Sequence, residues 1–505
     1  MDQAVQSMTG RMRRAFPLLS CGLVLILKAS LAQQAPAPVP TDLDGKWWGE
    51  VRHGPETGEL GVQFERRPDG SVLVREWMSN LNAYGLPVGR LQFKDGKFFV
   101  PEANVSLSLR ENLLTGSMAG ADLTLSLRRS DKTFPTEPQP TPVSPGPTPS
   151  WDYKATGPIW ASPITDHGIV FVGDSNGTLH AVDAANGKAK WTFRAGSGIF
   201  GAAAVRGDAL FFAADDGFLY KLNRNTGARF WRASIGGGDN KRVLPSREQP
   251  DWDARGAAPA LYDNVIYIGS ADGILHALDI GTGKPLWNFK TNGKIRAAAL
   301  ATKNAVYVGS LDHFLYALDC KTGVELWRFD TGSPVTTTPV LVRDKVIIGT
   351  REHATLYALD VKNGKPIWEV YYWLSWVESS PVLVDGLLYI GSSDSRRVRA
   401  IDPVNGRVIW AAQVWGWTWG TPLVVDDVVY YATGGTSSYF ITQTASLGAL
   451  DRQSGALMWR KPVPLRGGAF LSGYANSLAY AGGKIIAAGL DGTLQGFAPQ
   501  AMIRR

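Results

Sequence analysis

Apolar and polar residues alternate with a period of two along most of this chain, as expected for β-strands with one buried face. The alternation is clear in residues 71–75 and 123–127. Asp-Gly pairs at 69–70 and 95–96 stand between such runs and are typical of tight hairpin turns. Residues 42–130 therefore predict a small antiparallel β-barrel, with a sandwich as the alternative.

From Trp151 onward the strand pattern repeats about every forty residues. Seven strands end in an Asp or Asn that is followed by Gly four residues later and by Trp eight residues later. The first residues of these triplets are Asp183, Asn223, Asp279, Asp319, Asp360, Asp402 and Asp451, and the tryptophans are Trp191, Trp231, Trp287, Trp327, Trp368, Trp410 and Trp459. A period of this length built from strands indicates a radial β-repeat fold.

The ends of the repeat array predict how the ring closes. An eighth strand of the same kind, Thr493–Ala498, has no tryptophan after it. At the other end, residues 151–157 match 191–196, a strand that does carry the tryptophan. We therefore predict an all-β fold in which residues 151–500 form an eight-bladed propeller, and strand 151–157 completes the last blade.

The pattern Ala-x-Asp-x-x-Thr-Gly-x-x-x-Trp, as in residues 277–287, resembles the tryptophan-docking repeat of the pyrroloquinoline-quinone-type propeller family. It is similar to the propeller subunit of the outer-membrane β-barrel assembly machinery and, less closely, to quinoprotein dehydrogenases. Residues 45–49 resemble the Gly-x-Trp opening of calycin-like barrels. That resemblance implies either a barrel mouth for a small apolar ligand or a closed structural module.

The remaining segments predict export and a two-part layout. Residues 1–32 have a basic start, an apolar run and a small-x-small site ending at Ala32, so we expect a signal peptide. The secretory and twin-arginine routes both fit it. Residues 33–41 form a Pro-rich leader and 131–150 a Pro-rich linker. We expect a periplasmic or secreted protein without a transmembrane segment.

Departures from the regular repeat predict the working face. Insertions occur around 236–255 and 434–445, and the connections near 372–376 and 415–419 are aromatic. All should lie on one face, where aromatic rings suit a flat ligand, a sugar or a protein partner. They could instead seal the hub. The candidate aromatic residues are Tyr372, Trp373, Trp376, Trp415, Trp417 and Trp419.

The repeat also places Arg255, Arg296, Glu378 and Trp419 at the mouth of the central hub. The two arginines could bind carboxylates in a bidentate manner. Alternatively, these charges neutralise one another around a channel.

The sequence gives little support for catalysis. The expected mature chain has one cysteine, Cys320, and therefore lacks the vicinal cysteine pair that the resemblance to large quinoprotein dehydrogenases implies. It also lacks a Cys-x-x-Cys-His haem motif. His313 and His353 lie in successive turns, where solvated residues are more common than metal ligands. We expect no catalytic residue, no metal and no cofactor, with pyrroloquinoline quinone and calcium as the alternative.

Three functions remain open. The first is an exported, non-catalytic scaffold that binds a ligand or an envelope protein. The second is a quinone-dependent alcohol or sugar dehydrogenase, and the third is a carbohydrate-binding protein. The net charge of +7, about +4 without residues 1–32, does not favour a nucleic-acid partner.

Overall fold

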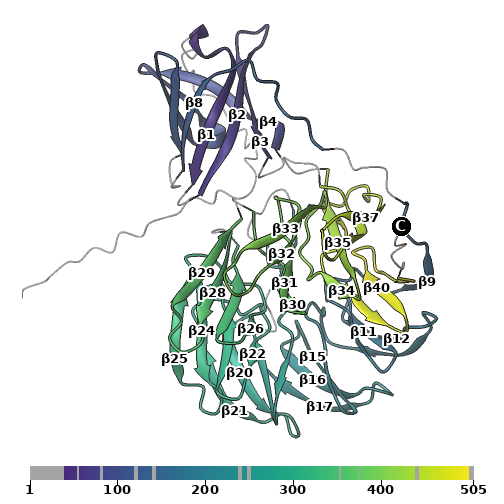
Figure 1. Cartoon of the computed structure of the whole chain (residues 1–505). Coiled ribbons are helices and arrows are strands. Elements are labelled where there is room, and N and C mark those ends of the chain that lie inside the picture. Colours follow the sequence, from purple (N-terminus) through teal and green to yellow (C-terminus); the bar gives the residue numbers. More distant parts are fainter. Residues whose placement is uncertain are drawn as a thin grey trace, which may run out of the picture. The chain divides into compact units, whose positions relative to one another are not determined.

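The protein is all-β in a computed structural model (Figure 1). Its described residues are 39–53, 56–79, 83–118, 123–138, 144–236, 241–246, 252–351, 354–372, 375–437 and 443–499. The expected signal peptide, most of the leader, Trp373 and His353 lie outside them. Within these residues, no helix is long and apolar enough to cross a membrane. The chain divides into two compact units, one of residues 1–77 and 85–134 and one of 78–84 and 135–505.

The first unit contains an antiparallel barrel that closes between its first and last strands, which confirms the predicted barrel. Its strands are β1 (Gly45–His53), β2 (Glu56–Arg66), β3 (Val72–Met78), β4 (Ala83–Lys94), β5 (Lys97–Val100), β6 (Val105–Arg110), β7 (Leu113–Met118) and β8 (Leu123–Arg129). The short helix η1 (Thr41–Leu43) closes one end: Leu43 is fully buried and its carbonyl accepts the indole N–H of Trp47 at 2.9 Å. A second short helix, η3 (Pro101–Ala103), follows β5.

Side chains alternate between the two sides of each barrel strand. On β3, Val72, Val74 and Met78 face inward and are at most 6% exposed. Trp77 faces outward and stacks on Phe134 at 4.0 Å. The same alternation places Glu76 on the inner face.

The second unit is a propeller of eight sheets, as the repeat count predicts. Blades one to four are β10 (Ile164–Asp166), β11 (Ile169–Gly173), β12 (Thr178–Asp183), β13 (Ala189–Arg194); β14 (Ala204–Arg206), β15 (Ala209–Ala214), β16 (Phe218–Asn223), β17 (Arg229–Ser234); β18 (Ala260–Tyr262), β19 (Val265–Gly269), β20 (Ile274–Asp279), β21 (Pro285–Lys290); and β22 (Leu300–Ala301), β23 (Ala305–Gly309), β24 (Phe314–Asp319), β25 (Glu325–Asp330).

Blades five to eight complete the ring. They are β26 (Val340–Val342), β27 (Lys345–Gly349), β28 (Thr355–Asp360), β29 (Pro366–Tyr371); β30 (Val382–Val384), β31 (Leu387–Ile390), β32 (Arg397–Ile401), β33 (Val408–Gln413); β34 (Leu423–Val425), β35 (Val428–Gly435), β36 (Ser446–Asp451), β37 (Leu457–Pro462), with β38 (Ser472–Gly473) beside β35; and β39 (Ala479–Ala481), β40 (Lys484–Ala488), β41 (Thr493–Phe497), β9 (Pro149–Lys154).

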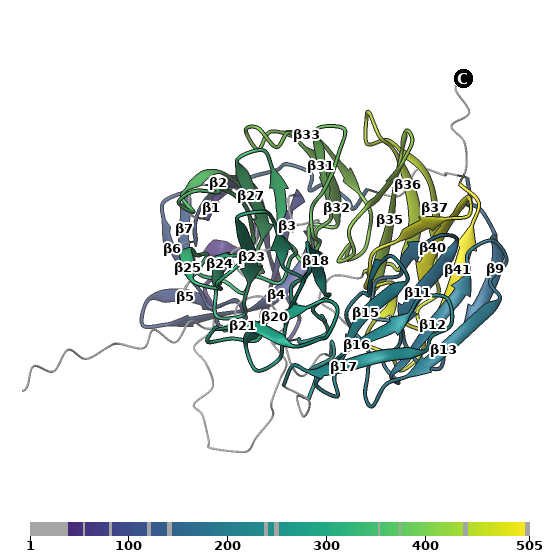
Figure 2. The same cartoon turned by 90° about the horizontal axis from the view of Figure 1, so that it is seen from below.

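The last blade takes its outer strand from the N-terminal side of the propeller. Strand β9 pairs antiparallel with β41, with Trp151 opposite Gly496 (Figure 2). The ring thus closes by exchange of a strand, which leaves no blade incomplete.

Seven docking tryptophans each pack against a turn glycine of the next blade. A β-carbon on Gly187 would lie 2.7 Å from the Trp151 ring, so only glycine allows this contact. The Trp151 indole also donates to the carbonyl of Ala184 at 3.0 Å. At the junction that closes the ring, Gly146 packs on Trp459, whose indole N–H has no partner among the described residues. The closing junction therefore keeps the packing contact but loses the hydrogen bond.

Candidate functional site

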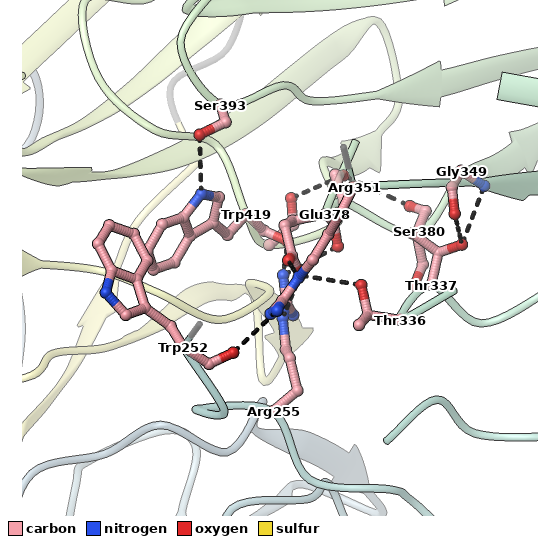
Figure 3. A network of polar contacts seen from close by, with 12 residues as sticks. Trp252, Arg255, Thr336, Thr337, Gly349, Arg351, Glu378, Ser380, Ser393 and Trp419 are labelled. Carbon is pink, nitrogen blue, oxygen red and sulfur yellow. Dashed lines mark hydrogen bonds and ion pairs between the residues drawn. The ribbon is translucent and has the colours of Figure 1, made fainter. Parts of the chain in front are cut away.

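The site predicted at the hub contains a buried carboxylate held by two arginines. Glu378, on the connection between β29 and β30, is 3% exposed. Its Oε2 accepts from Arg255 Nε at 3.2 Å and from Thr336 Oγ1 at 3.1 Å, and its Oε1 accepts from Arg351 Nε (Figure 3). Arg255 also donates to the carbonyls of Glu378 and Trp419, at 2.9 and 2.7 Å. Three predicted residues, Arg255, Glu378 and Trp419, therefore meet.

The charge state of Glu378 follows from these contacts. Burial alone would raise the pKa of its carboxyl, because it removes water from the ionised form. The positive charges of Arg351 and Arg255 outweigh burial and hold the pKa below its ordinary value. Glu378 is consequently ionised at neutral pH and serves as the shared counter-ion of both arginines.

The fourth predicted hub residue, Arg296, pairs with a different acid. Its Nε and Nη2 donate to the two oxygens of Asp253, both at 2.6 Å. Lys294 Nζ binds the same carboxylate at 2.9 Å. Arg242 lies 3.7 Å from Asp253 and forms two hydrogen bonds of 2.6 Å to Asp215. Burial opposes ionisation of Asp253, but Arg296 and the neighbouring cations keep its pKa lowered.

A tryptophan from the insertion between β17 and β18 fills the centre of the aromatic cluster. The ring of Trp252 lies 5.8, 5.7 and 5.9 Å from those of Trp376, Trp417 and Trp419, and 5.6 Å from Phe470. Trp417 and Trp419 stack on each other at 5.1 Å. Trp252 is 4% exposed, and none of the other three tryptophans exceeds 5%. The four tryptophan rings are thus buried against one another, and Phe470 beside them keeps intermediate exposure.

The backbone of this insertion is tied to the carboxylate cluster. The carbonyl of Trp252 accepts a hydrogen bond of 2.8 Å from Arg351 Nη1 (Figure 3). The same arginine donates to Glu378 through its Nε. The insertion thus supplies Trp252 to the aromatic cluster, and Asp253 and Arg255 to the two ionic clusters. Residues 252–255 therefore contribute an aromatic ring, a carboxylate and a guanidinium to the hub.

The other predicted aromatic residues lie in separate contacts. Tyr372 is fully buried beneath the guanidinium of Arg399, which is 3.7 Å from its ring. Trp415 is 9% exposed, carries Arg460 over its ring at 4.9 Å and donates to the carbonyl of Pro138 at 3.2 Å. The structure does not bring Tyr372 or Trp415 into the cluster around Trp252.

Sequence reasoning missed the partners that decide this site. Trp252, Asp253 and Arg242 lie in the insertion around 236–255, which the sequence predicts on the working face without singling out these residues. Arg351 follows β27 in a turn that carries no motif. Their signal was the clustering of charged residues on both sides of the tryptophan in the insertion, but the partner of each charge depends on the path of the chain.

The hub donors do not suit a calcium-bound quinone. Ca²⁺ prefers six to eight oxygen ligands, whereas both oxygens of Glu378 and both of Asp253 already accept from cations. Across the described ranges, no group of three or more His, Cys, Asp or Glu side chains is arranged to hold a metal.

Comparison with known proteins places the repeats in a wider group. A family model described as outer membrane protein assembly factor BamB matches residues 145–248, 215–372 and 352–501. Tetrathionate hydrolase from Acidithiobacillus ferrooxidans is 25% identical over 198 residues, which cover 30% of this chain and 40% of that protein. Outer membrane protein assembly factor BamB from Yersinia pestis is 26% identical over 143 residues, which cover 27% of this chain and 35% of that protein.

These matches span less than half the length of either curated relative. Among solved structures, quinohemoprotein alcohol dehydrogenase ADHIIG from Pseudomonas putida HK5 aligns with a TM-score of 0.53 at 14% identity, over 71% of this chain and 77% of that chain. Identity this low shows a shared fold and nothing about shared chemistry.

Proposed function

Because this chain belongs to the pyrroloquinoline-quinone-type repeat family whose matching model is described as outer membrane protein assembly factor BamB, we propose that it is an exported, non-catalytic propeller that serves as a binding scaffold for envelope proteins. The named relative supports the class of partner, and residues 1–32 support export.

One observation carries the non-catalytic part of the proposal: the charged groups at the hub are bound to one another. Glu378 is held by Arg255 and Arg351, and Asp253 by Arg296. A catalytic acid or base must reach a substrate proton, and a nucleophile must be accessible. Buried groups that are already paired stabilise the ring and leave binding to the outer surface.

A dye-linked dehydrogenase assay with pyrroloquinoline quinone and calcium tests this assignment against the enzyme alternative. We expect no quinone-dependent turnover with alcohols or sugars, and no saturable change in tryptophan fluorescence when the quinone is added. Quinone-dependent turnover that Arg255→Ala abolishes would overturn the proposal. Lys345→Ala, which removes a cation paired with the exposed Asp344, is the matched control.

Site-specific photo-crosslinking tests the scaffold role. Leu286, Leu326 and Ile367 occupy equivalent positions on the outer strands of three successive blades and are 54%, 53% and 44% exposed. With a photoreactive residue at each position in the native host, we expect at least one to form a light-dependent adduct with an envelope protein. If none of the three positions forms a light-dependent adduct with a protein, a scaffold that binds through this surface is contradicted.

Intact-mass analysis of the mature protein tests export. Cleavage after Ala32 predicts a chain that begins at Gln33. A chain that keeps residues 1–32 and stays in the cytoplasm would contradict the proposed location.

A further inference from the structure

One acidic side chain of the barrel faces inward and has no partner among the residues that the structure describes. Glu76 lies directly opposite Val62 on β2, and Val62 lies opposite Trp47 on β1. Trp47 and Val62 are 0% and 7% exposed, so this row of residues faces the barrel core. The neighbouring outward residue, Arg75, bonds Glu65 at 3.0 Å, which confirms that Glu76 points the other way.

The surroundings of Glu76 are apolar. Val74 and Met78, its neighbours on the inner face of β3, are 3% and 6% exposed, and Leu60 on β2 is 4% exposed. Glu76 itself keeps intermediate exposure, so its carboxyl is not packed over by these side chains. Eight-stranded barrels lie at the limit where the interior is either filled by side chains or holds one small ligand. Partial exposure at an inner position favours an interior that holds a small ligand beside Glu76.

The other ionisable side chains on the inner faces are occupied elsewhere. Arg66 bonds both oxygens of Asp44, at 2.7 and 2.9 Å, and Arg129 bonds the carbonyl of Asp44 at 2.8 Å, at the end closed by η1. His53 is the last residue of β1, at the other end of that strand. Burial is the sole cause of the perturbed pKa of Glu76, with no charge acting on it. Glu76 therefore lacks a counter-ion within the described residues.

We propose that the interior of the barrel binds a small amphiphile with a primary ammonium head, which pairs with the Glu76 carboxylate while its alkyl body lies among the inner side chains. An ionised carboxylate in apolar surroundings is stabilised by a cation that also donates hydrogen bonds. A neutral or anionic head supplies less of this compensation. The preference is thus for charge, and the apolar body supplies affinity that does not depend on Glu76.

Burial raises the pKa of Glu76 to about 7, so the preference for the amine should depend on pH. An alkylamine has a pKa near that of lysine, about 10.4, and stays protonated at pH 8. Glu76 is then mostly ionised, so the preference for the amine grows as the pH rises through about 7 and is weak at pH 5.5.

Calorimetry on the full chain with n-octylamine, n-octanol and n-octanoate tests the proposal. At pH 8 we expect octylamine to bind at least 10-fold more tightly than octanol, and octanoate to bind more weakly than either. Glu76→Gln should reduce the preference for octylamine to within about 2-fold and leave octanol binding unchanged. Glu50→Gln, which removes an exposed outer carboxylate of the same barrel, should leave all three affinities unchanged.

Three results would overturn the proposal. The first is equal affinity for octylamine and octanol in the unmodified chain. The second is a preference for octylamine that Glu76→Gln does not change, and the third is binding of neither ligand. Because Glu76→Gln removes an unpaired buried charge, it should not unfold the barrel, and unchanged protection of β2 and β3 in hydrogen exchange verifies this.

Discussion

Two inward carboxyl groups, Glu378 in the propeller hub and Glu76 in the barrel, have pKa values that are shifted in opposite directions. The pKa of Glu378 is lowered, because two arginines outweigh burial. The pKa of Glu76 is raised to about 7, because burial acts alone. Depth in the fold therefore does not decide the charge of a buried acid; its partners do. The hub acid is paired with cations, whereas no cation among the described residues pairs with Glu76.

Removing the hub acid should give the largest effect. Glu378→Gln leaves Arg255 and Arg351 facing each other without a shared counter-ion. We expect the propeller to lose about 3–5 kcal/mol of unfolding free energy, the usual cost of breaking a buried ion pair from one side. Denaturant unfolding followed by hydrogen exchange of hub peptides measures it. Glu325→Gln, at a partly exposed pair with Arg328, should change stability by less than about 1 kcal/mol; equal losses in both variants would contradict the role of the hub pair.

Emptying the aromatic cluster should have the next largest effect. Trp252→Ala removes the ring that contacts Trp376, Trp417 and Trp419. Large-to-small substitutions of buried aromatic residues cost about 3 kcal/mol or more. Trp252→Phe should recover most of this loss, since Phe restores part of the ring packing. If both variants unfold like the unmodified chain, Trp252 does not hold the mouth of the hub together.

Removing the barrel acid should increase stability, whereas removing the hub acid should decrease it. Because the folded pKa of Glu76 exceeds its ordinary value of 4.5, the folded barrel binds more protons between pH 4.5 and about 7. Its stability is then greatest below pH 4.5 and falls as the pH rises to about 7. Glu76→Gln should remove this dependence and stabilise the barrel at pH 8 by about 2 kcal/mol, allowing for partial exposure.

Hydrogen exchange of β3 peptides at pH 5.5 and 8, corrected for intrinsic exchange, measures the change. Greater protection at pH 8 than at pH 5.5 in the unmodified chain would have the wrong sign. The hub peptides provide the internal comparison, because the lowered pKa of Glu378 predicts that hub stability is lost only as the pH falls below the ordinary value of 4.5.

The smallest effect should come from the most exposed hub cation. Lys294 is 33% exposed at its side chain and shares Asp253 with Arg296, whose two hydrogen bonds remain without it. We expect Lys294→Met to cost about 1 kcal/mol or less. Arg296→Met, which removes the bidentate partner, should cost more in the same thermal unfolding experiment. The reverse order would show that Lys294 is the principal partner of Asp253.

The fold was predictable because it repeats. One missing tryptophan after Thr493 and one extra strand at Trp151 were enough to predict eight blades, since a ring admits few ways to close. The barrel followed from alternation and Asp-Gly turns, although those signals could not separate a barrel from a sandwich. Local patterns of this kind determine strands and their order.

The site was only partly predictable. The repeat register brought Arg255, Glu378 and Trp419 together, because each comes from the same position in its blade or one residue away. It did not predict that Arg296 pairs with Asp253, since Asp253 lies in an insertion outside the repeat. Nor did it single out Glu76, which occupies a regular inward position and differs from its neighbours only in chemistry. Pairing of charges depends on long-range geometry that periodicity does not encode.

The exchanged strand also constrains when the propeller can form. Lys154 and Thr493, which bond across the last blade, are 339 positions apart. A chain emerging from a ribosome or a translocation channel can complete the other seven sheets in order, but β9 stays without its neighbour until β41 has been delivered. Closing so long a loop is the entropically costly step. The final sheet is therefore the last of the eight that can be completed during synthesis.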